Sequence, residues 1–246
     1  KEGNYGSTES PAYKNAHDHD FVAVGTTPEE MQKLHGPPMG KDFPVFRGTV
    51  PGHEHLGKVE IALARKESKI TGQEGHKAFK VDFSPDIKLH EDLKRRDFTM
   101  NAIAYDHETK EVHDPFGGLD DIRTQTIKHV DEKAFTEDPL RVLRMGRLAA
   151  KLDFEVHPET MKLAKTVSIG SLPAERIWGE VKGALDSKKP SKFFNTMHES
   201  GHLKHIMPEL SKLKGVSHAN HGEDPYDHTM AAIDMAAKHN LPSEAR

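Results

Sequence analysis

Residues 17–25 read His-Asp-His-Asp-Phe-Val-Ala-Val-Gly, in which four apolar residues follow two acids and are closed by glycine. This run predicts a short buried strand over residues 21–24. Side chains alternate along a strand, so Asp18 and Asp20 are expected to point the same way, about 6–7 Å apart. Two carboxylates at the edge of a sheet can share a divalent cation with phosphate oxygens, because Mg²⁺ prefers hard oxygen ligands. An acidic turn ahead of a strand is the structural alternative.

A second strand is predicted over residues 59–64, which read Val-Glu-Ile-Ala-Leu-Ala. Glu60 lies between two apolar residues, so its carboxylate shares a face with the two alanines. An acid at this position is either a third metal ligand or a surface residue at a strand edge. Phosphoryl and nucleotidyl transfer use metal ions held by such carboxylates to activate the attacking oxygen and to neutralise the leaving pyrophosphate.

The rest of the chain divides into a mixed front and a helical back. Thr27 followed by Pro28 and two acids is typical of a helix N-terminus with Thr27 as the N-cap. Residues 66–77 are charged and contain glycine, which predicts a mobile loop. From about residue 137 the apolar residues recur with a helical period, punctuated by prolines. The expected fold class is therefore α+β.

Residues 137–147 read Glu-Asp-Pro-Leu-Arg-Val-Leu-Arg-Met-Gly-Arg and predict a helix with a cationic stripe. At about 100° per residue, four basic side chains fall within an arc of about 120°. They are Arg141, Arg144, Arg147 and Lys151. A solvated helix face usually mixes both signs of charge, yet no carboxylate shares this stripe before Asp153. The stripe therefore predicts an anionic ligand, since arginine suits phosphates and base edges; a plain basic surface is the alternative.

Residues 94–96, Lys-Arg-Arg, form a second cationic cluster directly before Asp97. An apolar stretch at 98–104 follows and contains Asn101, which is predicted to be buried. The structural alternative for this cluster is a helix with a charged N-terminal turn.

The composition excludes several classes of protein. The 35 Lys and Arg against 39 Asp and Glu give a net charge of −4, which excludes a histone-like polycation but leaves room for local basic patches. Cysteine is absent, which excludes disulfide scaffolds, thiolate zinc sites and cysteine nucleophiles. No apolar run approaches the ~20 residues that cross a bilayer. Residues 1–17 do not resemble a signal peptide, so we expect a cytoplasmic protein without a membrane partner.

Seven segments together resemble, in order, the motifs of the class II nucleotidyltransferase family, which holds the bacterial-type CCA-adding enzymes and poly(A) polymerases. The segments are residues 18–25, 41–46, 60–65, 94–102, 114–121, 137–144 and 175–180. One such motif would be weak evidence, but seven in the family's order are specific. The resemblance implies a DNA polymerase β-like mixed-sheet catalytic head over 1–130, followed by an all-helical part. That part would comprise a neck with the base template and RNA contacts over 131–212, and the start of an HD-like helical domain over 213–246.

The resemblance also implies roles for single residues. Asp18 and Asp20 would hold the catalytic Mg²⁺, and Glu60 would be a third catalytic carboxylate. Asp138 and Arg141 would be an amino-acid template for the incoming base. A carboxylate can accept from the exocyclic amine that cytosine and adenine share, and an arginine can donate to the ring nitrogen beside it, whereas G and U would leave mispaired polar groups. Further nucleotide contacts would come from Arg96, Asp97, Arg144 and Arg147.

The resemblance weakens at both ends of the sequence. The family's Gly-Gly-x-Val-Arg-Asp element, which helps to cradle the triphosphate, is not found in residues 1–17. Residues 218–229 resemble the entry to an HD phosphohydrolase domain, with His228 as its first metal ligand, but the His-Asp pair that names the domain does not follow. We therefore expect a chain that lacks both ends of a longer protein, and assign it no HD activity.

The leading hypothesis is a template-independent RNA nucleotidyltransferase that builds or repairs the 3′ CCA end of tRNA from CTP and ATP and releases pyrophosphate. A poly(A) polymerase shares the catalytic motifs, and a CC-only or A-only adding enzyme is a further alternative. A catalytically inactive RNA-binding module is the alternative from a different class, although the retained acids Asp18, Asp20 and Glu60 argue against it. A small-molecule nucleotidyltransferase would not need the helical half. The sequence does not indicate an oligomeric state.

Overall fold

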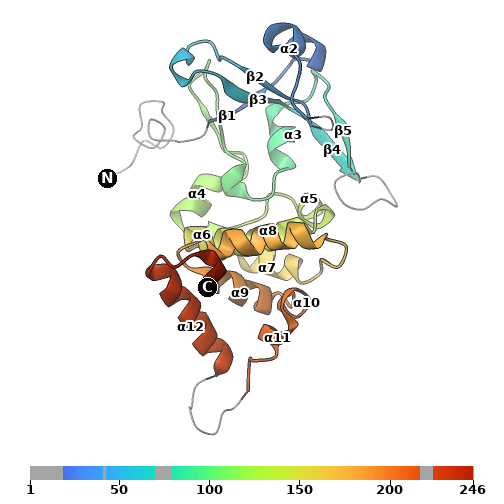
Figure 1. The fold of residues 1–246 in the computed structure, drawn as a ribbon. Helices are drawn as coiled ribbons and strands as arrows, with labels where there is room; N and C mark the ends of the chain where they lie inside the picture. Colours follow the sequence, from blue (N-terminus) through green and yellow to red (C-terminus); the bar gives the residue numbers. More distant parts are fainter. Residues whose placement is uncertain (1–18, 41–42, 70–78, 217–223, 246) are drawn as a thin grey trace. The chain divides into compact units, whose positions relative to one another are not determined.

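The computed structural model describes residues 19–40, 43–69, 79–216 and 224–245. The chain forms two compact units (Figure 1). Unit 1 contains residues 1–96 and 102–115, and unit 2 contains residues 97–101 and 116–246. Small mixed and two-stranded sheets in unit 1 and helices in unit 2 confirm the predicted α+β class. The predicted limits of the head, neck and HD-like domains stay a prediction.

Unit 1 is built on a three-stranded mixed sheet in the order β1 (Asp20–Ala23), β3 (Val59–Leu63) and β2 (Val45–Gly48). β1 runs parallel to β3, and β2 runs antiparallel to it. Both strands predicted from apolar runs, at 21–24 and 59–64, are present. β1 and β2 are therefore the two edges of this sheet.

The alternation of side chains gives the sheet two different faces. On one face Phe21, Ile61 and Phe46 occupy one row across the three strands, and they pack with Met31 and the end of β3 into a small apolar core. The side chains of the other face are polar or only partly buried. Burial of the first face fixes the register, because a shift by one residue would turn the apolar set to solvent.

Helix α2 (Pro28–His35) packs beside β2 and begins as the sequence predicts. The Thr27 hydroxyl accepts from the Glu30 N–H, and the Glu30 carboxylate accepts from the Thr27 N–H. The other elements of unit 1 are short: η1 (Glu54–Leu56), β4 (Lys66–Lys69), β5 (Phe79–Asp82), α3 (Leu89–Lys94), β6 (Ala104–Tyr105) and β7 (Val112–His113).

The prediction of a loop over residues 66–77 is wrong for its first four residues. Residues Lys66–Lys69 form β4, which pairs antiparallel with β5. Local charge and glycine content cannot reveal this strand, because its hydrogen-bond partners follow ten residues or more along the chain. The remainder of the predicted loop lies outside the described residues.

Unit 2 is mainly helical. Its elements are η3 (Thr99–Asn101), α4 (Gly118–Arg123), β8 (Thr126–Ile127), α5 (Glu132–Glu137), α6 (Leu140–Leu152), β9 (Glu155–Val156), α7 (Pro158–Ala164), α8 (Ala174–Leu185), α9 (Pro190–Glu199), α10 (Leu203–Ile206), α11 (Pro208–Ser211), α12 (Pro225–Lys238) and η4 (Ser243–Ala245). The expectation of an all-helical second half is wrong at β9, which pairs in parallel with β8. No helix among the described residues is long and apolar enough to span a membrane.

Helix α6 packs against α8 and α9 in unit 2 (Figure 1). On its apolar side, Val142, Leu143 and Met145 are fully buried. The close approach to α9 requires a glycine, because a Cβ on Gly146 would lie 2.9 Å from atoms of the Phe193 and Met197 side chains. The opposite side of α6 carries the predicted basic stripe.

Candidate functional site

A cavity of about 500 Å³ lies on the polar face of the three-stranded sheet in unit 1. Val22, Ala62 and Val45 line it and form one row across β1, β3 and β2. Asp20 and Glu60 also line it and face each other in the register of β1 and β3. Both acids are exposed, so a hydrated ligand can reach their carboxylates.

Asp20 and Glu60 fit a divalent cation by their donor chemistry. Adjacent strands lie ~4.8 Å apart, so carboxylates paired across two strands can share one hard cation. In the part of the chain that the structure describes, no three His, Cys, Asp or Glu side chains converge to form a complete metal site. Asp18, the predicted partner of Asp20, lies outside the described residues.

Arg95 and Arg96 line the same cavity, and a carboxylate that sequence reasoning missed holds both. The Asp92 side chain is completely buried. Its Oδ1 accepts from Arg95 Nε and Nη2 at 3.0 and 2.6 Å, and its Oδ2 accepts from Arg96 Nη2 at 3.4 Å. The backbone N–H of Arg65, just beyond β3, also donates to Asp92 at 3.2 Å. Asp92 therefore fixes the two cavity arginines relative to the central strand.

The sequence did contain a signal for Asp92. An acid three and four residues before two arginines on a short helix is spaced for side-chain pairing. Residues 94–96 are thus a cationic cluster whose acidic partner lies just upstream in the sequence, at Asp92.

Tyr105 and His107 also line the cavity and come from the returning segment, residues 102–115. The His107 ring stacks on Phe21, with centroids 5.2 Å apart, and meets the edge of His53 at 4.0 Å. Burial and the neighbouring His53 lower the pKa of His107, which favours the neutral form of its ring. Nothing in the local sequence links this segment to β1, so these rings could not be predicted.

Asp97 follows Arg96 in sequence but belongs to unit 2, where it is buried against α6. Its Oδ1 accepts from the Phe98 N–H at 2.8 Å and from Asn101 Nδ2 at 2.9 Å. Its Oδ2 accepts from Arg144 Nε and Nη2 at 2.8 and 2.7 Å. Burial alone would raise the pKa of Asp97, but the Arg144 guanidinium and the N–H donors outweigh it and lower the pKa.

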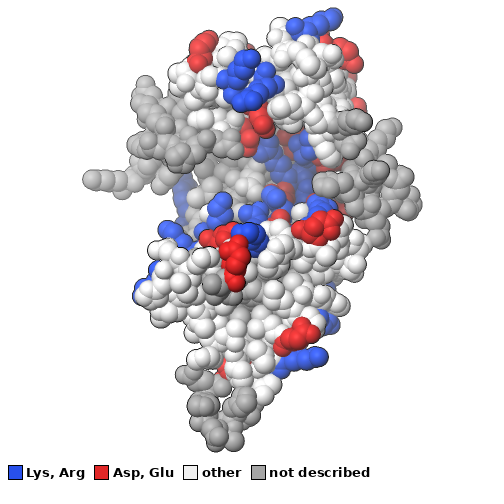
Figure 2. All heavy atoms as spheres, in the orientation of Figure 1, with Lys and Arg blue, Asp and Glu red and all other residues white. Residues whose placement is uncertain are grey.

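The basic stripe on α6 has partners, contrary to the expectation from sequence. Arg144 pairs with Asp97, and Arg147 Nε donates to Glu180 Oε2 on α8 at 2.5 Å. These acids lie 47 and 33 residues away in sequence, so the period of α6 could not reveal them. Figure 2 shows Lys and Arg side chains beside Asp and Glu side chains on one face of the molecule. The predicted absence of carboxylate partners is therefore wrong for Arg144 and Arg147.

Asp138 and Arg141 lie where α6 begins, and both are half-buried. Asp138 Oδ1 accepts from the Leu140 N–H at 3.1 Å, and the Asp138 carbonyl accepts from the Arg141 N–H at 3.0 Å. Asp138 thus satisfies a free N–H at the helix start, as Asp commonly does. This capping contact does not exclude contact with a base, because a carboxylate has a second oxygen and several lone pairs.

The predicted site residues therefore form two groups. The acids Asp20 and Glu60 and the guanidinium of Arg96 line the cavity of unit 1. The second group belongs to unit 2 and comprises Asp97, Asp138, Arg141, Arg144 and Arg147.

Two family models match this chain. The Poly A polymerase head domain matches residues 12–128, and the probable RNA and SrmB-binding site of polymerase A matches residues 153–214. Among curated proteins, the chain is 42% identical over 236 residues to a Multifunctional CCA protein of Nitrosomonas europaea, covering 93% of this chain and 55% of that protein. The corresponding protein of Chromobacterium violaceum is 43% identical, at 93% and 56% coverage. The chain thus spans about half the length of the curated relatives it matches.

Solved structures agree with these matches. The CCA-adding enzyme of Bacillus stearothermophilus in complex with CTP is similar with a TM-score of 0.63 and 27% identity, over 80% of this chain and 47% of that one. A tRNA-processing enzyme with CTP has a TM-score of 0.57 and 28% identity, over 78% of this chain and 50% of that one. Nucleotidyltransferases of this kind generally use a divalent metal. With two domain models, the relatives and the solved folds in agreement, the chain belongs to the family of bacterial CCA-adding enzymes and poly(A) polymerases.

Proposed function

We propose that this chain carries the nucleotidyl-transferring part of a tRNA nucleotidyltransferase that completes the 3′ CCA end from CTP and ATP. One observation carries the proposal: a single cavity joins the facing carboxylates Asp20 and Glu60 with the anchored guanidinium groups of Arg95 and Arg96. Acids for a metal and arginines for phosphate are the groups that nucleotidyl transfer needs. The curated relatives named Multifunctional CCA protein and the similar structures with CTP support this choice.

In the proposed reaction the RNA 3′-oxygen attacks the α-phosphorus of CTP or ATP. The bond from that phosphorus to the bridging oxygen breaks, and pyrophosphate leaves with the electron pair. Asp20 and Glu60, together with Asp18, would hold Mg²⁺, which when bound activates the attacking hydroxyl and neutralises charge on the leaving group. Arg95 and Arg96 present fixed donors to the phosphates, because Asp92 holds them before the ligand arrives.

In unit 2, Asp138 and Arg141 are proposed to read the base and Arg147 to contact the nucleotide from the same helix. Asp97 uses both carboxylate oxygens on groups of the protein, so its proposed role is to position Arg144 for the nucleotide. The side of α6 that follows Asp138 would thereby offer the nucleotide a fixed set of hydrogen-bond donors and acceptors.

The test is incubation of the chain with tRNA that lacks its 3′ end, given Mg²⁺ with CTP and ATP separately and together. We expect addition of two C residues with CTP alone and of C, C and A with both nucleotides, whereas tRNA with a complete end should not be extended. A long A tail with ATP alone would show a poly(A) polymerase, and products that stop at CC or require a CC end would show a partial enzyme. Binding of tRNA without any addition would favour the inactive RNA-binding module.

Base selection by Asp138 gives a sharper prediction. Asp138→Asn keeps an oxygen for the Leu140 N–H but adds a donor, so the variant should fold normally and admit UTP or GTP. A lost base contact is worth ~1–3 kcal/mol, so selectivity for CTP should fall by roughly five- to 150-fold in kcat/KM ratios. The matched control is Asp131→Asn, since Asp131 caps α5 through the Ala134 N–H and should leave selectivity unchanged. Equal proportional loss for all four nucleotides would show that Asp138 does not read the base.

We also propose a cytoplasmic location, because tRNA, CTP and ATP are the proposed substrates. Fractionation of cells that express a tagged full-length protein should recover it with the tRNA pool, and recovery in the membrane pellet would contradict this.

A further inference from the structure

Arg47 on β2 is exposed, and its guanidinium forms no ion pair or hydrogen bond with any residue that the structure describes. The other described arginines of unit 1 differ in this respect. They are Arg65, Arg95 and Arg96, and each is held by a carboxylate. As far as the described residues go, the charge and donors of Arg47 are therefore available to a ligand.

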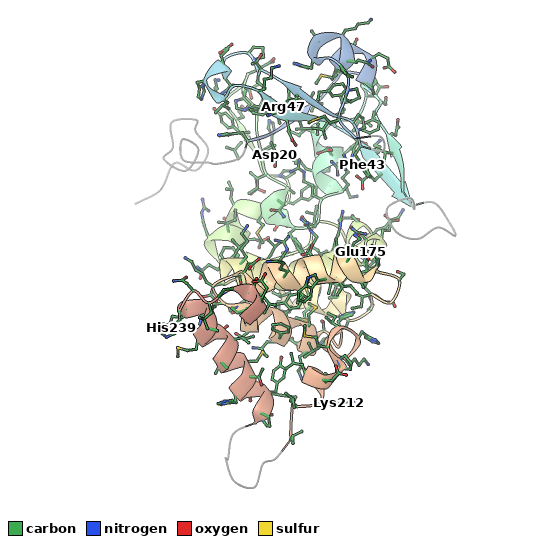
Figure 3. All side chains as sticks on the ribbon, in the orientation of Figure 1. Asp20, Phe43, Arg47, Glu175, Lys212 and His239 are labelled. Carbon is green, nitrogen blue, oxygen red and sulfur yellow. The ribbon has the colours of Figure 1, made fainter. Side chains whose placement is uncertain are left out.

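The register of the sheet places Arg47 in the same row as the two acids of the cavity. Arg47 pairs with Glu60 across β2 and β3, and Glu60 pairs with Asp20 across β3 and β1. Residues paired across strands share a face, so these three side chains leave the polar face of the sheet in one line. Figure 3 labels Asp20 and Arg47 on this sheet. Arg47 does not itself line the cavity, but the register places it next to Glu60, which does.

The charges in this row are complementary to a nucleoside triphosphate. A triphosphate carries more negative charge than one divalent cation between two carboxylates can balance. Arg47 adds a positive charge on the Glu60 side, opposite Asp20. It lies on an edge strand, where its long side chain is free to turn toward a bound anion. A guanidinium also offers forked donors that match two phosphate oxygens at once.

We propose that Arg47 binds the β- or γ-phosphate of the incoming nucleotide and holds the pyrophosphate as it leaves. This inference rests on the proposed function, because it assigns Arg47 to the triphosphate of the same cavity. A phosphate of the RNA backbone is the other anion that Arg47 could bind, and the second measurement distinguishes that case from binding of the nucleotide.

The first measurement compares the affinities of CTP and CMP by equilibrium dialysis with Mg²⁺, in the wild-type chain and in Arg47→Gln. Arg47 should act only on phosphates that CMP lacks. Arg47→Gln should therefore weaken CTP binding about 10- to 100-fold, the range expected for charge-assisted hydrogen bonds, and leave CMP binding unchanged. Arg47→Lys should recover part of the loss. The control is Arg123→Gln, which removes an exposed arginine paired with Asp120 in unit 2 and should change neither affinity.

The second measurement separates this inference from the proposed function. In tRNA extension assays, Arg47→Gln should raise the KM for CTP and for ATP by a similar factor and leave the KM for tRNA unchanged. A raised KM for tRNA with unchanged CTP binding would assign Arg47 to RNA and overturn the inference. Equal loss of CTP and CMP affinity, or no loss, would also overturn it, even if the wild type completes CCA ends. If CTP binding depends on Arg47 but the wild type adds no nucleotide to tRNA, the proposed function would be contradicted and the inference about Arg47 would stand.

Discussion

Replacing Asp20 with alanine is expected to lower the rate of nucleotide addition by on the order of 10³-fold or more, because a lost metal ligand costs several kcal/mol of transition-state stabilisation. The side chain is exposed at the start of an edge strand, so the substitution opens no cavity in the core. It also removes one of two like charges that face each other across β1 and β3, so the melting temperature should not fall.

The measurement is single-turnover incorporation of CTP into tRNA that lacks its 3′ end, together with thermal unfolding. Asp86→Ala is the matched control, because Asp86 is an exposed acid of unit 1 that does not line the cavity. Asp18→Ala should behave like Asp20→Ala if the two acids share the metal. Retention of more than about a tenth of wild-type turnover in Asp20→Ala would be incompatible with its assignment as a metal ligand.

The second large expected effect is a loss of stability when Asp97 is replaced. Asp97→Ala should lower the free energy of unfolding by about 3 kcal/mol, the low end for breaking a buried ion pair. The low end applies because Arg144 keeps 35% of its side chain exposed, and water can partly replace the lost carboxylate. The variant also leaves the Phe98 N–H and the Asn101 amide without their acceptor. Urea unfolding measures the loss, and Asp120→Ala, which breaks an exposed pair, should change little.

The stability that Asp97 contributes depends on pH, and the direction of its pKa shift determines how. The folded-state pKa of Asp97 lies below its unfolded value, which is near ~3.9. The stabilisation is therefore fully present above that value and is lost as the pH falls through the folded-state pKa. The gap in stability between the wild type and Asp97→Asn should thus be constant from pH 7 to about 5 and should narrow on further acidification. A gap that is unchanged at about pH 3 would show that the Arg144 pair does not produce it.

Local patterns were sufficient for the parts of the fold that short-range physics determines. The strand at 21–24 follows from four apolar residues closed by glycine, and the start of α2 follows from Thr27 and Pro28. The alternation around Glu60 correctly separated its side chain from the apolar core. Each of these features depends on residues within about one turn or one strand, so the sequence alone carries the information.

The features that the sequence did not predict depend on partners far along the chain. The stripe on α6 looked unpaired because Asp97 and Glu180 reach it from other segments. β4 looked like a loop because β5 supplies its hydrogen bonds. Tyr105 and His107 reach the cavity through the path of the returning segment, which no local pattern encodes. Asp92 is different, because its spacing to Arg95 was visible and only its complete burial was not.

The two units are interleaved in sequence, since the chain passes between them after residues 96, 101 and 115. A fragment that ends at 96 would lack the rings of Tyr105 and His107, and one that ends at 115 would carry Asp97 without Arg144. Gene fusions that exchange heads between relatives at a single junction in this region would therefore split either a cavity wall or a buried ion pair. Neither unit can therefore be cut from this chain as one continuous segment.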